Sequence, residues 1–393
     1  MSLEKIAKET NAFICLDCGI CTGSCPVSRV KPQFSPRLTV EKTLFDLETE
    51  VLEDKDLWSC LTCGLCSARC PSEVDYHQFI QRSRAQAAAS GQRAVSSHGG
   101  VMEALMQLQT QGHPQNRVGW VDNQKLQVST EQGEYFYFVG CLPYFEIIHS
   151  NIDVPSLSSA RDAVRILNRL GIQPVVSNQE RCCGHDLYWS GDTNSFKRLA
   201  ELNLEAISRS GAKKVVFTCA EGYSVFKVEY PRYFGSLSFE VLHLTELLDE
   251  KISQGKLRLS GPEHQVTYQD PCRLGRALGI YEAPRRVLKA IEGLELLEME
   301  RHGSEALCCG SSQWLNCTSA TKQLQVQRLR EAQGTGAQTL VTACPKCRIH
   351  LSCTLRDMEK INCSEGRGFE IKDLVNLVAE SMIEEKKSTI DET

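Results

Sequence analysis

The chain has 393 residues, of which 20 are cysteine, 41% are apolar and 24% are charged, and its net charge is −5. This composition excludes a disordered chain and predicts roughly two to three domains, and the negative charge argues against nucleic acid as a partner. We find no apolar run of signal-peptide or membrane-span length, so neither a disulfide-rich secreted protein nor a membrane span of its own is expected. The cysteines are therefore expected to bind metal in a cytoplasmic protein.

Residues 1–90 contain two copies of the pattern C-x2-C-x2-C-x3-C-P. The first copy consists of Cys15, Cys18, Cys21 and Cys25, and the second consists of Cys60, Cys63, Cys66 and Cys70. Bacterial two-cluster ferredoxins have this spacing, and in them the fourth cysteine of each copy binds the other cluster. We therefore expect one [4Fe–4S] cluster on Cys15, Cys18, Cys21 and Cys70, and a second on Cys60, Cys63, Cys66 and Cys25. A pair of zinc sites is the alternative, but such sites usually show paired C-x2-C arms.

The rest of the first 133 residues is expected to support these clusters and to lead to the next domain. Helices are predicted over 39–47 and 76–89, the second packing on the clusters, so residues 1–90 form a mainly α-helical ferredoxin-like domain. Residues 91–133 are rich in Ser, Gly and Gln. This composition predicts a surface linker, with one helix over 100–109.

The remaining chain contains an internal repeat, which predicts one CCG (cysteine-rich) domain over 134–262 and another over 263–378. Copy one contains Cys141, Cys182, Cys183 and Cys219, and copy two contains Cys272, Cys308, Cys309, Cys344 and Cys347. A Cys-Cys-Gly triplet stands in the middle of each copy. Residues 379–393 are expected to form a charged tail.

Short β-branched runs bounded by Gly or Pro alternate with helical patterns in both copies. Strands are predicted over 135–139, 174–177, 214–217 and 240–244 in copy one, and over 265–268, 294–298, 338–342 and 369–372 in copy two. Helices are predicted over 156–170, 195–210, 283–291 and 320–333. This alternation predicts an α/β domain with a mostly parallel sheet for each copy, and the whole chain is expected to be a multidomain α+β and α/β protein.

Four cysteines, Cys141, Cys219, Cys272 and Cys344, follow closely on predicted strands. Ligands of open α/β sheets collect outside the carboxyl ends of the strands. We therefore expect these cysteines in one crevice per copy, with each Cys-Cys-Gly loop joining from the side. The glycines of those loops, Gly184 and Gly310, would allow a tight turn.

Copy two, on the pattern Cys272…Cys308-Cys309-Gly310…Cys344-x-x-Cys347, resembles the CCG domain that occurs twice in the B-type subunit of heterodisulfide reductase. Residues 1–90 resemble the C-type subunit of the same enzyme through CGICTGSCP, SPRLTVEKTLF and WSCLTCGLCSARCP. Both parts on one chain, in this order, resemble the fused D-type subunit. The iron–sulfur subunits of anaerobic glycerol-3-phosphate dehydrogenase and of glycolate oxidase have the same layout, so the resemblance does not define a substrate.

The resemblance implies that a complete CCG motif carries a noncubane [4Fe–4S] cluster and that such clusters split a disulfide. The residues that would hold this cluster, and that we take as catalytic, are Cys272, Cys308, Cys309, Cys344 and Cys347. Copy one departs from the pattern, because Gly222 stands where the fifth cysteine is expected. Its remaining cysteines are enough for a cluster or for zinc, an empty site is the third alternative, and His185 is a candidate to complete the site.

A few nearby residues have a plainer interpretation. Cys317, Cys353 and Cys363 fit no motif and are expected to be small buried residues. Arg273 and Arg276 either orient a substrate and shield cluster charge, or form surface ion pairs.

No flavin-binding, nicotinamide-binding or P-loop motif is present, so the chain would exchange electrons with other redox subunits, such as a flavoprotein, a cytochrome or a bifurcating flavin protein. The first hypothesis is an iron–sulfur subunit of an anaerobic oxidoreductase that reduces a disulfide or another two-electron acceptor at the CCG domains. The alternative is an electron-relay subunit of a flavin-dependent dehydrogenase for glycerol-3-phosphate, glycolate or lactate, which delivers electrons to quinone or another carrier. A structural scaffold is a third hypothesis, which the intact second copy disfavours. Any membrane association would come through a partner.

Overall fold

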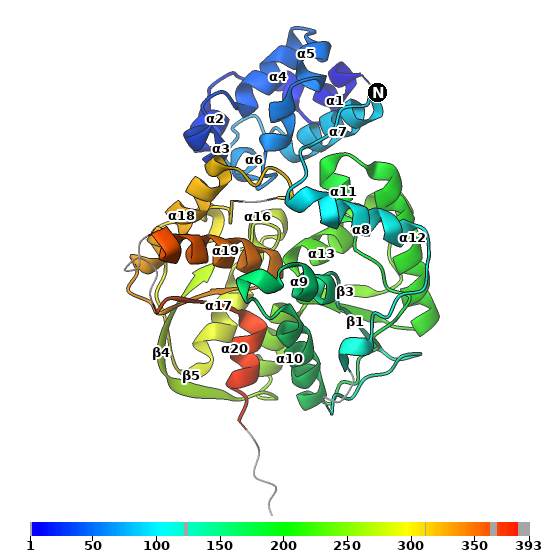
Figure 1. Ribbon diagram of the computed structural model, residues 1–393, viewed down its shortest axis with the longest axis vertical. Coiled ribbons are helices and arrows are strands. Elements are labelled where there is room, and N and C mark those ends of the chain that lie inside the picture. Colours follow the sequence, from blue (N-terminus) through cyan, green and yellow to red (C-terminus); the bar gives the residue numbers. More distant parts are fainter. Residues whose placement is uncertain (1, 122–124, 311, 362–367, 384–393) are drawn as a thin grey trace, which may run out of the picture.

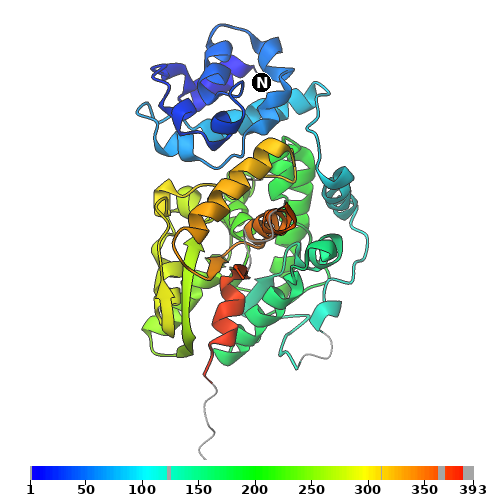
Figure 2. The same cartoon turned by 60° about the vertical axis from the view of Figure 1, so that its left-hand side comes forward.

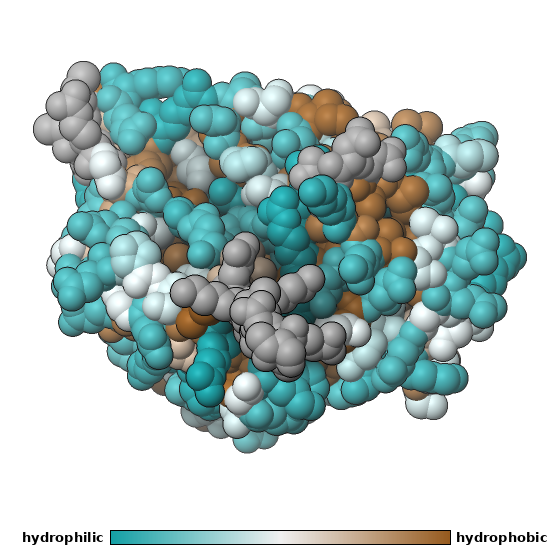
Figure 3. Space-filling model, turned by 90° about the horizontal axis from the view of Figure 1, so that it is seen from below, coloured by the Kyte–Doolittle hydropathy of each residue, from teal (hydrophilic) through white to brown (hydrophobic). Residues whose placement is uncertain are grey.

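A computed structural model describes residues 2–121, 125–310, 312–361 and 368–383. Its helical N-terminal domain lies above two α/β halves that stand side by side in the view of Figure 1, and Figure 2 shows the same arrangement from another side. One cluster of buried apolar side chains extends through all three parts, from Leu3 to Val378. The face opposite the N-terminal domain is mostly hydrophilic (Figure 3).

The N-terminal domain consists of short helices and loops. Its helices are α1 (Leu3–Glu9), α2 (Ile20–Ser24), α3 (Pro26–Val30), α4 (Pro36–Leu44), α5 (Glu48–Leu52), α6 (Leu65–Ala68) and α7 (Tyr76–Ala89). The helix predicted over 76–89 is confirmed as α7, which begins at a cap where Asp75 accepts a hydrogen bond from the Gln78 backbone. The helix predicted over 39–47 is confirmed for 39–44, which belong to α4, but the chain leaves the helix at Phe45 and turns at Asp46 (φ 59°) before α5 begins.

The linker contains α8 (Val101–Thr110), in agreement with the predicted helix. The first half that follows has a parallel sheet with strand order β1-β2-β3, formed by β1 (Tyr135–Phe138), β2 (Lys214–Phe217) and β3 (Glu240–His243). Its helices are α9 (Leu142–Ile148), α10 (Ser156–Arg169), α11 (His185–Ser190), α12 (Thr193–Ser210), α13 (Ala220–Ser224), α14 (Tyr230–Phe234) and α15 (Leu244–Ser253).

The second half has a parallel sheet with strand order β5-β4-β6-β7. Its strands are β4 (Leu259–Gln269), β5 (Ile291–Leu296), β6 (Thr339–Thr342) and β7 (Glu370–Asp373). Its helices are α16 (Gly275–Leu278), α17 (Glu282–Lys289), α18 (Ser319–Gln333), α19 (Pro345–Ile361) and α20 (Leu374–Glu380). The prediction of parallel α/β sheets is therefore confirmed for the described residues.

The strand predicted over 174–177 is wrong in extent. Val175 makes single bridges to Phe136 and Ser129, and its backbone pairs with Tyr135 and Tyr137 at 2.7 and 2.9 Å. Its neighbours pair on the other side, where the Pro174 carbonyl oxygen accepts from the Ser129 backbone (2.9 Å) and the Val176 backbone donates to Ser129 (2.9 Å). The strand predicted over 294–298 also begins earlier, because β5 starts at Ile291.

A fully buried arginine, Arg84 of α7, joins the three parts of the molecule. Its guanidinium donates to the carbonyl oxygens of Leu57 (3.0 Å) and Cys60 (2.7 Å) in the N-terminal domain. It also donates to the carbonyl oxygen of Trp189 (2.8 Å) in the first half and to Gln313 Oε1 (3.2 Å) in the second. Because these acceptors are buried, each needs a donor from within the protein.

We expect Arg84→Met to lower the free energy of unfolding by about 3 kcal/mol, because it leaves several buried carbonyl oxygens without a donor. Arg82 on the same helix is the matched control, since it makes only a partly exposed ion pair with Glu9. Arg82→Met should cost under about 1 kcal/mol. Anaerobic denaturant titration measures both, and equal losses would contradict the joining role of Arg84.

Candidate functional site

The two ferredoxin-type loops have the same backbone conformation. In the first, Asp17 (φ 53°) and Gly19 (φ 77°) are left-handed, and in the second, Thr62 (φ 48°) and Gly64 (φ 78°) are left-handed at the equivalent positions. The backbone N–H of Asp17 points at Cys15 Sγ (3.4 Å), and that of Thr62 points at Cys60 Sγ (3.3 Å). Such N–H groups stabilise a sulfur ligand, so both loops fit an iron–sulfur cluster.

The fourth cysteine of each run lies beside the other run. The Cys21 thiol is close enough to Cys15 and Cys70 for their charges to act on it. Burial raises the pKa of the Cys25 thiol to about 12, and Cys63 and Cys60 contribute to the increase. A small cavity is lined by cysteines that include Cys15, Cys18, Cys21, Cys66 and Cys70. The arrangement is compatible with the exchanged ligand sets expected from the sequence.

The Cys-Cys-Gly loops are tight turns in both halves. Gly184 (φ 79°) and Gly310 (φ 77°) are left-handed, as expected. A Cβ atom on Gly184 would lie 2.8 Å from Phe196, and one on Gly310 would lie 2.8 Å from Gln325. Both positions therefore exclude a side chain as well as favouring glycine for its backbone.

All five cysteines of copy two come together. Hydrogen-bonding contacts connect Cys272 to Cys308, Cys308 to Cys309, Cys309 to Cys347 and Cys347 to Cys344. Cys272 follows β4 and Cys344 follows β6, so the carboxyl ends of neighbouring strands supply the outer members. Burial of adjoining thiols is unfavourable for their anionic forms, and a bound metal cluster would supply positive charge at this place.

The cysteines of copy one are less gathered. Cys141 Sγ lies 3.8 Å from Cys182 Sγ, and Cys182 contacts Cys183. Cys219 is close enough to Cys183 for its charge to act on that thiol, and it also contacts Cys344 of the other copy. The crevices of the two copies therefore adjoin at the pair of Cys219 and Cys344.

A further thiol contact connects the N-terminal domain to copy two. Cys63 contacts Cys308, and this contact, with help from Arg276, lowers the pKa of Cys63 to about 6. Sulfur atoms therefore follow one another from Cys63 through copy two to Cys219. This proximity between domains could not be deduced from spacing within either motif.

A buried polar cluster lies between the two halves, beside these thiols. Lys346 Nζ contacts Asp186 Oδ1 at 2.5 Å and Glu221 Oε2 at 2.7 Å. His185 Nδ1 lies 2.9 Å from Asp186, and its Nε2 accepts a hydrogen bond from Arg273 (3.0 Å). His185, Asp186 and Glu221 are close enough to hold a metal ion, but Lys346 and Arg273 already supply the cations. Because both nitrogens of His185 are engaged, the expectation that this histidine completes the copy-one site is not supported.

Burial sets the charges within this cluster. It raises the pKa of Glu221 well above its usual range and lowers the pKa of His185 to about 3. Burial alone would also raise the pKa of Asp186. Lys346 and His185 outweigh this effect and hold the pKa of Asp186 below its usual range. Lys346 and Asp186 therefore balance each other, and the positive charge of Arg273 remains for the neighbouring sulfur groups.

Arg273 and Arg276 are not surface ion pairs, so that alternative is wrong. Arg273 is 4% exposed, donates to Thr62 Oγ1 (2.6 Å) and stacks on Trp189, with its guanidinium carbon 4.1 Å from the ring centroid. Arg276 donates to the carbonyl oxygen of Cys63 at 2.7 Å. Both arginines favour the thiolate forms of Cys63 and Cys272.

The expectation for the unassigned cysteines is wrong where it can be examined. Cys317 is exposed and Cys353 is partly exposed, where it accepts a hydrogen bond from Lys322 (3.1 Å). Cys363 lies outside the described residues, as does most of the expected tail. No helix in the described ranges combines the length and apolar character needed to cross a membrane.

Comparison with known proteins agrees with this division of the chain. Residues 11–74 match the 4Fe-4S dicluster domain family, and residues 135–227 and 266–352 each match the cysteine-rich domain family. The D-type subunit of dihydromethanophenazine:CoB–CoM heterodisulfide reductase from Methanosarcina barkeri is 33% identical over 276 residues, covering 68% of this chain and 63% of that protein. The matched region spans less than two thirds of the D-type subunits from Methanosarcina barkeri, Methanosarcina acetivorans and Methanosarcina mazei.

Other relatives differ in the reaction that their names describe. EtfAB:quinone oxidoreductase from Syntrophomonas wolfei is 31% identical over 249 residues, covering 59% of this chain and 34% of that protein. The crystal structure of a hypothetical protein from Helicobacter pylori has a TM-score of 0.58 at 11% identity, covering 89% of this chain and 67% of that chain. At this identity the last match indicates the fold alone.

We expect Arg276→Met to lower the reduction potential of the adjacent iron–sulfur site. A lost positive charge disfavours an added electron by about 2 kcal/mol at ~8 Å, which is on the order of 100 mV for one electron. Redox titration followed by electron paramagnetic resonance measures this shift. Arg286→Met, which removes an exposed partner of Asp249, should leave the potential unchanged, and a similar shift in both variants would contradict the electrostatic role of Arg276.

Proposed function

We propose that the chain is an iron–sulfur subunit like the D-type subunit of heterodisulfide reductase, and that it passes electrons from a redox partner to its CCG domains, where a disulfide or another two-electron acceptor is reduced. The observation that carries the proposal is the contact between Cys63 and Cys308. This contact brings the second ferredoxin-type loop against the complete CCG motif. Electrons arriving at the N-terminal domain would thus have a short route into copy two.

In this proposal the ferredoxin-type cysteines hold two [4Fe–4S] clusters with their fourth ligands exchanged, and copy two holds a noncubane [4Fe–4S] cluster. The ligands of the last cluster are Cys272, Cys308, Cys309, Cys344 and Cys347. Iron–sulfur clusters, when bound, accept and release electrons one at a time. The protein residues then have defined tasks: the backbone N–H groups of the loops stabilise sulfur, and Arg273 and Arg276 offset negative charge.

For copy one we propose a further cluster or a zinc ion on Cys141, Cys182, Cys183 and Cys219. Four thiolates suffice for either group. Gly222 leaves the fifth position of a noncubane site without a thiol. The engagement of His185 by Asp186 and Arg273 disfavours that residue as a substitute.

The second candidate function is electron relay for a flavin-dependent dehydrogenase of the glycerol-3-phosphate, glycolate or lactate type, with quinone or another carrier as acceptor. It is favoured by the incomplete motif of copy one, because the resemblance to the B-type subunit implies two intact motifs for disulfide cleavage. The gathered thiols of copy two disfavour a purely structural scaffold. Either function needs a partner, for which we propose a flavoprotein, a cytochrome or a bifurcating flavin protein, and we propose a cytoplasmic location with any membrane contact made by that partner.

Iron analysis tests the proposed clusters. We expect about 12 iron atoms and about as many labile sulfides in anaerobically purified protein, or about 16 if copy one also holds a cluster. Cys309→Ser should remove about 4 iron atoms and abolish disulfide reduction, while the resonance signals of the N-terminal clusters persist. Cys317→Ser, at an exposed cysteine, is the matched control and should change neither. A wild-type content near 8 with zinc present would contradict the noncubane cluster.

The copy-one site is tested by Gly222→Cys. A Cβ atom at this position would lie 3.8 Å from Cys183 Sγ and 3.3 Å from Phe217, so a thiol here can reach the copy-one cysteines. We expect the variant to change the resonance spectrum of that site, whereas Gly222→Ala, which adds the Cβ without the thiol, should not. Identical spectra for both variants would favour zinc or a site without metal.

A further inference from the structure

A cavity of about 50 Å³ lies where the linker and the two CCG halves meet, and three histidines line it. His98 belongs to the linker, His149 follows α9 and His350 belongs to α19. At the rim of the cavity, His98 and Asn151 are exposed. Because a water molecule needs a cavity of about 10–15 Å³, this one has room for a few waters.

Two of the histidines have a buried ring nitrogen that makes no hydrogen bond. His149 and His350 are 3% and 8% exposed, and the Nε2 atom of each is buried without a partner in the protein. Trp314 holds both rings, with its centroid 4.8 Å from that of His149 and 4.7 Å from that of His350. The exposed ring of His98 lies 5.5 Å from that of His149. Water in the cavity would satisfy the two nitrogens and connect them with the surface.

The inner end of the cavity reaches the thiols of copy two. His350 and Cys309 are close enough for their charges to act on each other. Gln325, another lining residue, packs on the Cys-Cys-Gly loop, because a Cβ atom on Gly310 would lie 2.8 Å from its side chain. The cavity therefore leads from solvent to the place where copy two gathers its cysteines.

The histidines of this cavity are not arranged as a metal site. A metal ion needs ligand atoms that converge on one point. Among the described residues, a group with ligand atoms within 4.8 Å of one another consists of His185, Asp186 and Glu221, none of which lines this cavity.

Burial keeps His149 and His350 neutral near pH 7. It lowers the pKa of His149 to about 4, with a contribution from His98, and it lowers the pKa of His350 to about 3. Lys346 and the other two histidines add to the decrease at His350, whereas Cys309 opposes it. A neutral imidazole accepts a proton on one nitrogen and releases one from the other, so such a ring can pass protons on.

Reduction of a disulfide at copy two requires protons. Cleavage of one S–S bond takes two electrons and gives two thiolates, each of which takes up one proton to become a thiol. Four of the five cysteines of copy two are buried, so the protons need a path through the protein.

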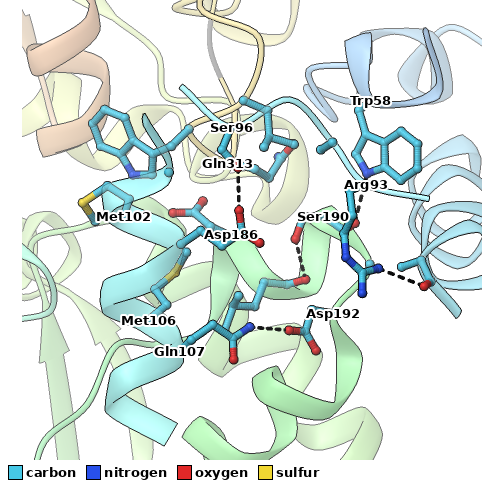
Figure 4. A pocket seen from close by; sticks show the side chains of 18 of the residues that line it. Trp58, Arg93, Ser96, Met102, Met106, Gln107, Asp186, Ser190, Asp192 and Gln313 are labelled. Carbon is cyan, nitrogen blue, oxygen red and sulfur yellow. Dashed lines mark hydrogen bonds between the residues drawn. The ribbon is translucent and has the colours of Figure 1, made fainter. Parts of the chain in front are cut away.

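A larger cavity, of about 750 Å³, also approaches copy two, because Asp186 lines it (Figure 4). Asp186 contacts Lys346 at 2.5 Å in a buried ion pair. A proton released by Lys346 would leave the Asp186 carboxylate buried and uncompensated, which is costly. The neutral histidines of the smaller cavity do not carry that cost.

We propose that the three histidines, with water between them, carry protons from the surface to the acceptor site of copy two. The inference rests on the proposed function, because the two electrons come from the redox partner through the N-terminal domain. His98 takes up a proton at the surface, His149 passes it inward, and His350 delivers it beside Cys309 to a thiolate of the product. Trp314 is a positioning residue for the two inner rings.

The test uses the anaerobically purified, cluster-containing protein, with reduced methyl viologen as electron donor and 2-hydroxyethyl disulfide as acceptor. We expect His149→Ala to lower kcat by about tenfold or more at an unchanged KM. Free imidazole, for which this variant leaves space, should restore part of the rate, as it would not for a general structural defect. His113→Gln, at an exposed histidine outside the lining, should behave like the wild type. His149→Gln, of similar size to the wild type, is the second variant for the case that His149→Ala does not fold.

Ferricyanide provides an independent measurement, because it takes up an electron without a proton. We expect all variants to reduce ferricyanide at the rate of the wild type. Equal disulfide reduction by the wild type and a folded His149 variant would overturn the proposal, as would an equal loss with ferricyanide or a rate that imidazole leaves unchanged. A wild type that has its iron–sulfur signals but does not reduce the disulfide would instead contradict the proposed function, on which the path depends.

Discussion

The burial of many sulfur ligands at one junction is the constraint on which the rest of this structure depends. Thiolates and iron–sulfur groups carry negative charge, and burial penalises charge unless cations lie nearby. The chain supplies these cations as Arg84, Arg273 and Arg276, all of which are wholly or largely buried. Each is held by several partners from different parts of the chain, so the charges that serve the sulfur groups also hold the domains together.

This double role explains why the N-terminal domain cannot be regarded as a ferredoxin on a flexible tether. Arg276 of copy two donates to the carbonyl oxygen of Cys63, and Arg84 of the N-terminal domain donates to Trp189 of copy one. Thr62, inside the second ferredoxin-type loop, accepts from Arg273. The loop that would hold the second cluster is therefore fixed by the CCG halves, and its position relative to copy two is determined by hydrogen bonds rather than by the linker.

The sequence predicts the local parts of this arrangement well. Cysteine spacing depends on the geometry of one loop, so the ferredoxin-type loops and the left-handed Gly184 and Gly310 can be expected. The parallel sheets can be expected because strand patterns alternate with helical patterns. The helix α19 is not among the helices predicted from the sequence, although Pro345 is a favourable first residue of a helix. The contact of Cys63 with Cys308 and the cluster around Lys346 involve residues far apart in the chain. No local pattern marks them, and lysine or arginine in a sequence is ordinarily a surface residue.

The difference between the two copies follows from the same charge balance. At the offset that aligns Cys219 with Cys344, Glu221 corresponds to Lys346 and Gly222 to Cys347, and the side chains of Glu221 and Lys346 contact each other across the junction. The backbone of Gly222 is helical within α13, so it does not itself require glycine. A fifth thiolate at this position would add negative charge beside Asp186, whose carboxylate already balances the single ammonium group of Lys346. Copy one thus lacks a cysteine at the point where the Lys346 side chain of copy two enters the junction and pairs with the carboxyl groups of Asp186 and Glu221.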